Sequence, residues 1–237
     1  MSDRRPVLVI GGTRGTGLCV ANKLAGQSVP VRVLARDPVR ARGRLDHSIQ
    51  IVSGDITKPS TLPASVAGVH TIVLTAGCRS GRPAREASVI ATEYEGVRNV
   101  LSAARASGFS GRLLYMTASG VTKHSFATMA LNLYKGHTLV WRLRAEDEIR
   151  NSGLDYTIIR AAFLTNGTGG HRGVFITQNP LPFIWYRIGR EDLAEVFIAA
   201  AGHPRASRAT FEVAWTGRYR QQVSDLLDSL KPDAELN

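Results

Sequence analysis

Short apolar runs alternate with longer segments of helical apolar spacing along most of the chain. Short runs bounded by turn residues are typical of buried strands, whereas apolar positions that recur every three or four residues are typical of helices. The predicted strands are residues 7–10, 31–35, 49–52, 71–75, 113–116, 156–160, 174–177 and 210–214. The predicted helices are residues 18–24, 87–107 and 138–151, one that opens at residue 190, and 221–230. This alternation predicts an α/β fold with a doubly wound parallel sheet.

Three segments interrupt the alternation of strands and helices. The length of 237 residues suits a single domain over residues 1–237, and no internal repeat or interdomain linker divides it. Residues 121–136, 162–188 and 215–237 are rich in loops and less regular. We expect these three segments to form a small C-terminal lobe on the substrate side of the domain.

A glycine-rich turn lies between the first predicted strand and the first predicted helix. Its sequence is Gly11-Gly-Thr-Arg-Gly-Thr-Gly17. Glycine lets a phosphate approach the backbone closely, and free N–H groups at the start of a helix attract an anion. Strand, glycine turn and helix in this order form the first unit of a Rossmann-type dinucleotide-binding fold. The turn therefore predicts a nucleotide-cofactor site.

The end of the second predicted strand is basic. An acidic residue at this place binds the ribose 2′-hydroxyl of NAD, whereas a basic residue accommodates the 2′-phosphate of NADP. Arg36 stands there and Arg40 follows, and guanidinium groups suit phosphate through their paired donors and permanent charge. Arg14 in the glycine turn can reach the same phosphate, whereas Asp37 favours NAD unless it opens a turn before Pro38. We predict NADP over NAD, with a solvated cluster of surface arginines as the alternative.

Two further strand ends add smaller signals. Asp55 follows the third predicted strand, where its carboxylate suits either the adenine amino group or the cap of the next turn. Thr75, Ala76 and Gly77 close the fourth strand, and small residues there let the backbone lie against a cofactor. Both positions are consistent with a nucleotide that follows the carboxyl edge of the sheet.

The chain resembles atypical short-chain dehydrogenase/reductases of the NAD(P)-binding, NmrA-like kind from about residue 7 to residue 214. The resemblance is carried by the glycine turn and by residues 33–38, 54–55, 94–100, 140–146, 152–160 and 190–194. It implies a pyrophosphate site at Gly11, Thr13, Arg14, Gly15 and Thr16, and a 2′-phosphate site at Arg36 and Arg40. It further implies that Asp55 and Ile56 flank adenine, that Thr75, Ala76 and Gly77 line the ribose, and that Thr117, Ala161, Ala162 and Phe163 lie near the nicotinamide.

The residues that carry the chemistry are less clear than those that bind the cofactor. Many enzymes of the superfamily transfer a proton through a Tyr-x-x-x-Lys pair, and this sequence has none. Arg142 stands where related proteins often carry lysine, and arginine can hold a ribose or an oxyanion but does not titrate. Its alternative role is an i,i+4 partner for Glu146. The candidate donors are Thr117, Ser119, Tyr134, His137 and His124, and His171 lies in the same region, although histidines in loops are more often simply solvated.

Aromatic side chains are concentrated in one of the irregular segments. Phe163, Phe183, Trp185 and Tyr186 can stack on a planar substrate, or they can form the core of the small lobe. Both interpretations are open from the sequence, and the second is slightly favoured.

The composition is that of a soluble globular protein with a basic surface. The 30 Lys and Arg against 19 Asp and Glu give a net charge of +11, but they are dispersed and no nucleic-acid-binding motif accompanies them. Neither a signal peptide nor a membrane-spanning run is expected. Cys19 and Cys78 have no metal-ligand spacing, so we expect buried free thiols, no metal site and a cytoplasmic setting.

These observations predict an NADPH-dependent oxidoreductase that transfers hydride to a small, planar conjugated acceptor of the quinone, flavin or aromatic carbonyl type. Such acceptors can take their proton from water, so that catalysis consists mostly of placing two rings in contact. The alternatives are a non-catalytic NADP-binding regulator or scaffold and, less favoured, an epimerase or isomerase. Expected partners are a small-molecule substrate and, as an open alternative to a monomer, a second copy in a homodimer.

Overall fold

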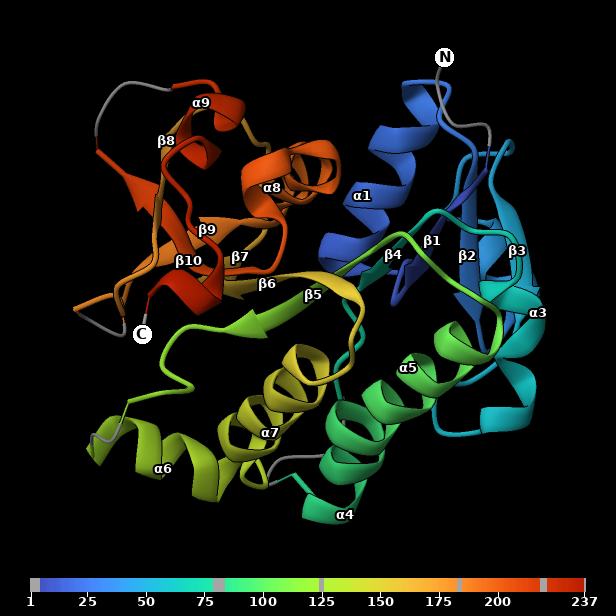
Figure 1. Ribbon diagram of the computed structural model, residues 1–237, viewed down its shortest axis with the longest axis horizontal. Coiled ribbons are helices and arrows are strands. Elements are labelled where there is room, and N and C mark those ends of the chain that lie inside the picture. The colour runs from blue at the N-terminus through green and yellow to red at the C-terminus, as the bar shows by residue number, and fades with distance from the viewer. Residues whose placement is uncertain (1–4, 79–83, 124–125, 183–184, 218–220, 237) are drawn as a thin grey trace.

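Eight strands form one sheet in the order β3-β2-β1-β4-β5-β6-β10-β8 (Figure 1). The computed structural model describes residues 5–78, 84–123, 126–182, 185–217 and 221–236. All neighbouring strands are parallel except the edge pair of β10 and β8, which is antiparallel. The predicted doubly wound α/β fold of the Rossmann type is therefore confirmed, with one antiparallel edge strand added.

The observed elements follow the predicted alternation closely. The strands of the main sheet are β1 Val7–Ile10, β2 Val31–Ala35, β3 Gln50–Ser53, β4 Thr71–Leu74, β5 Arg112–Ala118, β6 Asp155–Ala161, β8 Gly173–Thr177 and β10 Ala209–Thr216. The helices are α1 Gly15–Gly26, α2 Pro38–Arg42, α3 Pro63–Val66, α4 Glu86–Val89, α5 Gly96–Ala106, α6 Phe126–Tyr134, α7 Thr138–Arg150, α8 Arg190–Gly202 and α9 Val223–Leu227. Short 3₁₀ turns lie at Pro59–Thr61, Pro204–Ala206 and Asp233–Glu235.

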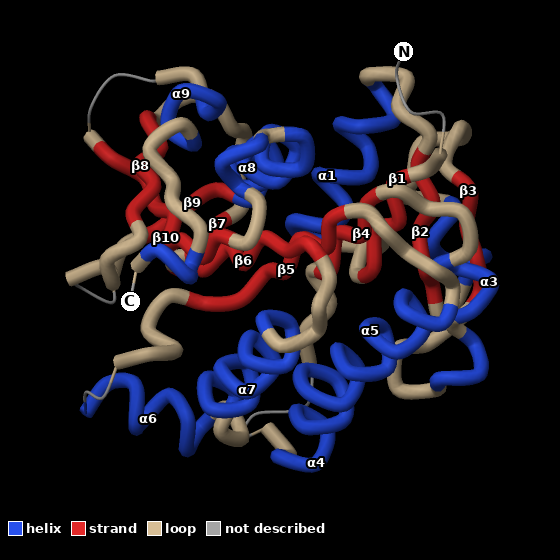
Figure 2. Tube along the Cα trace, in the orientation of Figure 1, coloured by secondary structure: helices blue, strands red, loops and turns tan. Residues whose placement is uncertain are grey.

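The sheet is buried on both faces, as its unbroken apolar runs predict. In β1, Val7 and Val9 belong to the core beneath α1 and α8, whereas Leu8 and Ile10 belong to the core beneath α3, α5 and α7. Figure 2 shows the two groups of helices on opposite faces of the strands. Each fully buried Val, Leu or Ile contributes about 1.5–3 kcal/mol to stability. Four consecutive apolar residues with alternating side-chain directions therefore fix β1 in the centre of the sheet.

The segment predicted as one helix over residues 87–107 has a different path at its start. After α4, residues Ile90–Glu95 form a π-helical turn, and α5 follows directly from it. A π turn places one more residue in each turn than an α-helix does, so it changes which side chains face inward. Here Glu93 is directed into the protein and is only 4% exposed.

The three segments expected to form a lobe have different positions in the structure. Residues 163–165 and 187–189 pair as the short parallel strands β7 and β9 in a sheet of their own. By contrast, β8 extends the main sheet, and α9 packs on α8. α6 lies beyond α7 at the rim of the molecule (Figure 1). A substrate-binding role for these segments stays a prediction.

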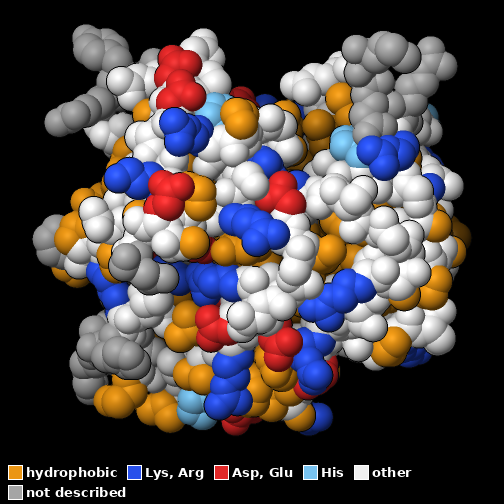
Figure 3. Space-filling view, viewed as in Figure 1, with side chains coloured by type: hydrophobic (Ala, Val, Ile, Leu, Met, Phe, Trp, Pro, Cys, Tyr) orange, Lys and Arg blue, Asp and Glu red, His pale blue; other side chains and the backbone are white. Residues whose placement is uncertain are grey.

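The basic side chains are dispersed among acidic and apolar ones on the face drawn in Figure 3. Over the residues that the structure describes, no helix combines the length and the apolar character that crossing a bilayer requires.

Candidate functional site

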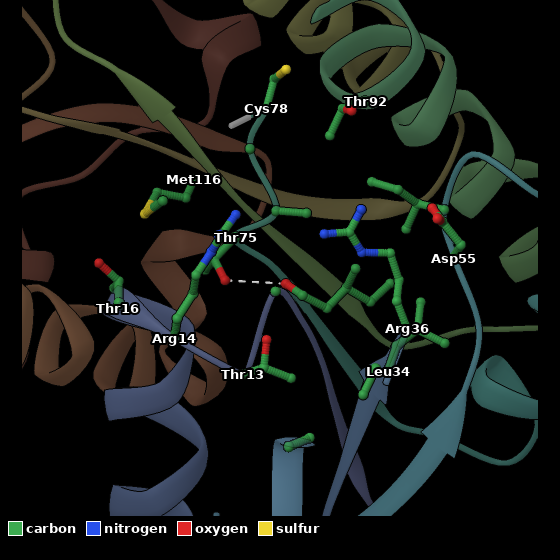
Figure 4. Close-up of a pocket in the computed structure, with 18 of the residues that line it drawn as sticks. Thr13, Arg14, Thr16, Leu34, Arg36, Asp55, Thr75, Cys78, Thr92 and Met116 are labelled. Carbon is green, nitrogen blue, oxygen red and sulfur yellow. Dashed lines mark hydrogen bonds between the residues drawn. The ribbon is translucent and has the colours of Figure 1, made fainter. Parts of the chain in front are cut away.

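A cleft of about 1290 Å³ opens at the carboxyl ends of the parallel strands. Its walls come from the β1–α1 turn and from the segments that follow β2, β3 and β4. The chain order of the strands reverses between β1 and β4, and ligands of open α/β sheets bind at such a switch point. Figure 4 shows Arg14 and Thr16 on one side of this cleft and Arg36 and Asp55 on the other.

Close packing makes glycine necessary in the β1–α1 turn. Gly11 has a φ of +89°, and a Cβ there would lie 2.7 Å from the backbone nitrogen of Ala76. A Cβ on Gly17 would lie 2.4 Å from Thr75 Oγ1, which itself donates a hydrogen bond to the carbonyl of Ile10 at 3.1 Å. The turn is thus pressed against the end of β4, and its outer side faces the cleft.

The start of α1 is free to accept an anion. Arg14 occupies the N-cap position in an extended conformation and provides no side-chain cap. The first N–H groups of a helix have no partner within the helix, and the helix dipole favours negative charge there. Gly15 and Thr16 line the cleft at this point, so the predicted pyrophosphate residues do converge on one surface.

Substituting Gly17 with alanine is expected to strain the contact between α1 and β4. Crowding a packed site costs about 1–3 kcal/mol, and moving the turn should also weaken NADPH binding more than tenfold. Urea unfolding and NADPH fluorescence titration measure the two effects. Gly26→Ala is the matched control, because nothing lies within 4 Å of a Cβ at that exposed helical position. Equal behaviour of the two variants would contradict the close packing described above.

Asp37 opens a turn, as its position before Pro38 suggests. Its Oδ1 accepts a hydrogen bond of 3.0 Å from the backbone N–H of Arg40 and so caps α2, with Pro38 in the first turn. Arg36 lines the cleft, its guanidinium points into the cavity in Figure 4, and it has no hydrogen bond or ion pair to any described residue. Arg40 and Arg44 line the same end. This end therefore presents unpaired guanidinium charge beside the carboxylate that caps α2.

Asp55 also caps a turn. Its Oδ1 accepts hydrogen bonds of 3.0 Å from both the backbone N–H and the hydroxyl of Thr57. The neighbouring Ile56 is buried, and its carbonyl accepts a hydrogen bond of 2.8 Å from the Asn99 amide. Both Asp55 and Ile56 line the cleft, so contact with an adenine remains geometrically open to them.

A buried carboxylate supports the opposite end of the cleft. Glu93 accepts hydrogen bonds from Arg142 Nε and Nη2, each at 3.0 Å, and from the backbone N–H of Cys78 at 3.0 Å. The hydroxyl of Thr138, the first residue of α7, donates to the same carboxylate. A Cβ on Gly77 would lie 3.1 Å from Arg142 Nη2. The Glu93–Arg142 pair thus lies directly behind the Gly77–Cys78 backbone.

The alternative role of Arg142, as an i,i+4 partner of Glu146, is wrong, because Arg142 pairs with Glu93. Glu146 is fully buried and instead pairs with Arg160 at 2.7 Å and with Arg150 at 2.9 Å. The reason is the π-helical turn, which brings Glu93 within reach of Arg142 from a distant part of the sequence.

The pKa of Glu93 reflects this environment. Burial by itself raises the pKa of the carboxyl, but the charge and hydrogen bonds of Arg142, with the bonds from Thr138 and Cys78, outweigh burial and leave the pKa below its usual value. Glu93 is therefore a charged group at neutral pH, and its ion pair with Arg142 is present there.

The candidate proton donors are not gathered at the cleft. Tyr134 is half-exposed at the end of α6 beside Lys135, and His137 precedes α7 with its Nδ1 3.2 Å from Glu86. His171 is exposed and contacts the hydroxyl of Thr168. His124 lies outside the described residues. None of the described members of this group lines the cleft, so the geometry gives their proposed role no support.

Thr117 and Ser119 have a different environment. Both hydroxyl groups are buried near the end of β5 and have no hydrogen-bond partner in the part of the chain that the structure describes. They do not line the cleft, and neither do Ala161, Ala162 and Phe163. A role for these residues next to a nicotinamide stays a prediction.

The aromatic residues divide between the core and the surface. Tyr186 packs edge-on against Phe175 with a centroid distance of 5.7 Å, whereas Phe163 and Trp185 are more than half exposed. Phe183 lies outside the described residues. Tyr186 is therefore part of the core packing, as one of the two interpretations predicts. Phe163 and Trp185 are not part of the core.

Several cleft residues escaped the sequence interpretation. They are Cys78, Ser88, Ala91, Thr92, Met116, Leu164, Asn166 and Arg190. The sequence carried one signal for Arg190, because this residue opens a predicted helix and the start of a helix attracts anions. Cys19 and Cys78 are free thiols as predicted but half-buried rather than buried, and no group of three or more His, Cys, Asp or Glu among the described residues could hold a metal ion.

Comparison with known proteins identifies the family. A family model described as NAD(P)H-binding matches residues 11–204, which include the glycine turn and the first turn of α8. The chain belongs to this family. The resemblance to atypical short-chain dehydrogenase/reductases is thereby confirmed, and the narrower NmrA-like assignment stays a prediction.

Relatives agree with this assignment over nearly the whole chain. A sanguinarine reductase of Eschscholzia californica is 25% identical over 248 residues, which cover 90% of this chain and 89% of the relative. An anaerobilin reductase of Escherichia coli O157:H7 superposes with a TM-score of 0.72 at 21% identity and covers 91% of this chain and 100% of its own. An oxidoreductase from Lactococcus lactis gives 0.77 at 14% identity, with 95% and 96% covered. The two structural matches show the fold alone.

Proposed function

We propose that the protein is an NADPH-dependent reductase that transfers hydride to a small, planar conjugated acceptor of the quinone, flavin or aromatic carbonyl type. The observation that carries this proposal is the continuous cleft from Arg36, past the glycine turn, to Gly77. Its residues fit a dinucleotide phosphate, because unpaired guanidinium groups lie at one end and an uncapped helix start lies at the middle. The reductase class is taken from the sequence relative that is named as a sanguinarine reductase.

The chain's own residues would bind and orient the two reactants. A bound NADPH would supply the hydride. Arg36 and Arg40 would hold its 2′-phosphate, the turn at residues 11–17 its pyrophosphate, and the rigid Gly77–Cys78 backbone would support its nicotinamide end. In this arrangement most of the rate enhancement comes from holding donor and acceptor rings in contact.

The lining of the cleft supports the proposed type of acceptor. Among the described lining residues there is no Tyr, His or Lys that could donate a proton near neutral pH. Quinones, flavins and related conjugated acceptors can accept hydride and take the proton from water. Simple ketones and aldehydes need a donor at the carbonyl oxygen, so they are expected to be poor substrates.

A non-catalytic NADP-binding regulator is the second candidate. It is favoured by the lack of a Tyr, His or Lys among the described lining residues of the cleft. It is also favoured because Thr138 and Arg142 are bound to Glu93. A cytoplasmic location and a homodimer also stay predictions.

NADPH oxidation with a panel of acceptors separates the two functions. We expect turnover of at least one quinone or flavin and little turnover of small aldehydes. The absorbance of NADPH is the measurement, and NADPH binding is measured in parallel by fluorescence. Binding without turnover of any acceptor would favour the regulator and overturn the reductase.

A further inference from the structure

Arg190 lies against the glycine turn although it comes from the C-terminal half of the chain. It is the first residue of α8, which packs on α1, and it lines the cleft. A Cβ on Gly15 would lie 3.4 Å from Arg190 Nε, with the side chain of Arg190 as its nearest neighbour. The guanidinium therefore stands beside the first residue of α1, where the N–H groups of the helix start are free to meet an anion.

Asn166 holds this guanidinium in place. Its Oδ1 accepts a hydrogen bond of 2.7 Å from Arg190 Nη1, and Asn166 also lines the cleft. The loop that follows is anchored to the first turn of α8, because Glu191 accepts from the N–H of Gly169 at 2.9 Å and Asp192 accepts from the N–H of Gly170 at 2.7 Å. The remaining N–H groups of Arg190 have no partner among the described residues.

Thr16 provides an independent sign of a ligand at the same place. It is the second residue of α1, it lines the cleft, and it is only 3% exposed. Its Oγ1 has no hydrogen-bond partner among the described residues. Buried hydroxyl groups are normally hydrogen-bonded, so an unpaired one that lines a cleft points to a partner bound in the cleft.

We propose that Arg190 binds the pyrophosphate of the nicotinamide cofactor together with Thr16 of the glycine turn, so that α8 adds a second phosphate-binding element to that turn. This inference rests on the cofactor of the proposed function but not on catalysis. A guanidinium offers paired donors to phosphate oxygens, and the hydroxyl of Thr16 adds a third. Because NAD and NADP share the pyrophosphate, Arg190 and Thr16 would contribute to the binding of both cofactors. Arg36 would contribute only to the binding of NADP, through the 2′-phosphate.

Binding of four nucleotides to the full chain tests this assignment. In Arg190→Ala we expect the affinities for NADPH, NADH and ADP-ribose to fall by a similar factor of ~10–100, the size of a lost charge-assisted contact. The affinity for 2′-AMP, which lacks the pyrophosphate, should stay within twofold. Thr16→Val should lower the same three affinities by about fivefold, and Arg190→Lys should recover part of the loss by restoring the charge.

Arg205→Ala is the matched control, because it removes the same charge from an exposed position in the Pro204–Ala206 turn, which does not line the cleft. Circular dichroism and melting temperature confirm that all variants fold. Unchanged ADP-ribose affinity in Arg190→Ala would overturn the proposal, and so would an equal loss for 2′-AMP or a wild-type chain that binds no pyrophosphate nucleotide. Failure of the reductase proposal is seen separately, as tight NADPH binding without turnover.

Discussion

Replacing Arg36 with alanine is expected to weaken NADPH binding ~10–100-fold and to leave NADH binding nearly unchanged. The guanidinium of Arg36 has no partner among the described residues, and it points into the cleft (Figure 4). A hydrogen bond to a charged group contributes about 1.5–3 kcal/mol, and only NADPH carries the phosphate that would form it. The measurement is titration of both cofactors at one fixed, low salt concentration, because salt screens such contacts.

Two variants make this result specific. Arg98→Ala removes an exposed arginine of α5 that pairs with Glu95, and it should change neither affinity. Arg40→Ala should reduce NADPH affinity less than Arg36→Ala, because Arg40 lies within α2, farther from the end of β2 than Arg36. A similar loss for NADH and NADPH in Arg36→Ala would show that Arg36 does not read the 2′-phosphate.

The features that local sequence determines were predictable. The strands β1, β2 and β4 are short, mainly apolar runs. The glycine turn between β1 and α1 has the spacing that is typical of dinucleotide-binding folds. Asp37 illustrates the same principle at one residue, since an aspartate before proline is a good helix cap. In each case the structure depends on residues that are close to one another in the sequence.

The features that depend on distant contacts were not predictable. Glu93 looks like an ordinary charged residue on an amphipathic helix, and only the π-helical turn makes it a buried partner of Arg142, 49 residues away. Arg190 reaches Gly15 because α8 packs on α1, which no local periodicity reveals. Among the described proton-donor candidates, Tyr134, His137 and His171 do not line the cleft, and for Tyr134 the reason is similar, since tertiary packing places α6 at the rim of the molecule.

Replacing Glu93 with alanine is expected to lower the free energy of unfolding by about 3–5 kcal/mol, because it leaves Arg142 charged, largely buried and unpaired. The Cys78 N–H and the Thr138 hydroxyl also lose their acceptor. Equilibrium unfolding in urea measures the change. Glu95→Ala, in the same π-helical turn but at an exposed ion pair with Arg98, should cost less than about 1 kcal/mol. Equal costs would mean that the buried pair does not stabilise the fold.

The pH dependence of the unfolding free energy separates the contribution of the Glu93 charge from the contribution of its packing. The folded-state pKa of Glu93 lies below its usual value of 4.5, so its ion pair stabilises the fold fully at neutral pH, and this stabilisation is lost as the pH falls below about 4.5 through the folded-state pKa. The difference in unfolding free energy between wild type and Glu93→Gln should therefore shrink on acidification in that range. Since the same carboxylate fixes the Gly77–Cys78 backbone, NADPH affinity of Glu93→Gln should also fall at pH 7, where the protein is folded. A stability difference that is constant with pH would assign the role of Glu93 to packing rather than to charge.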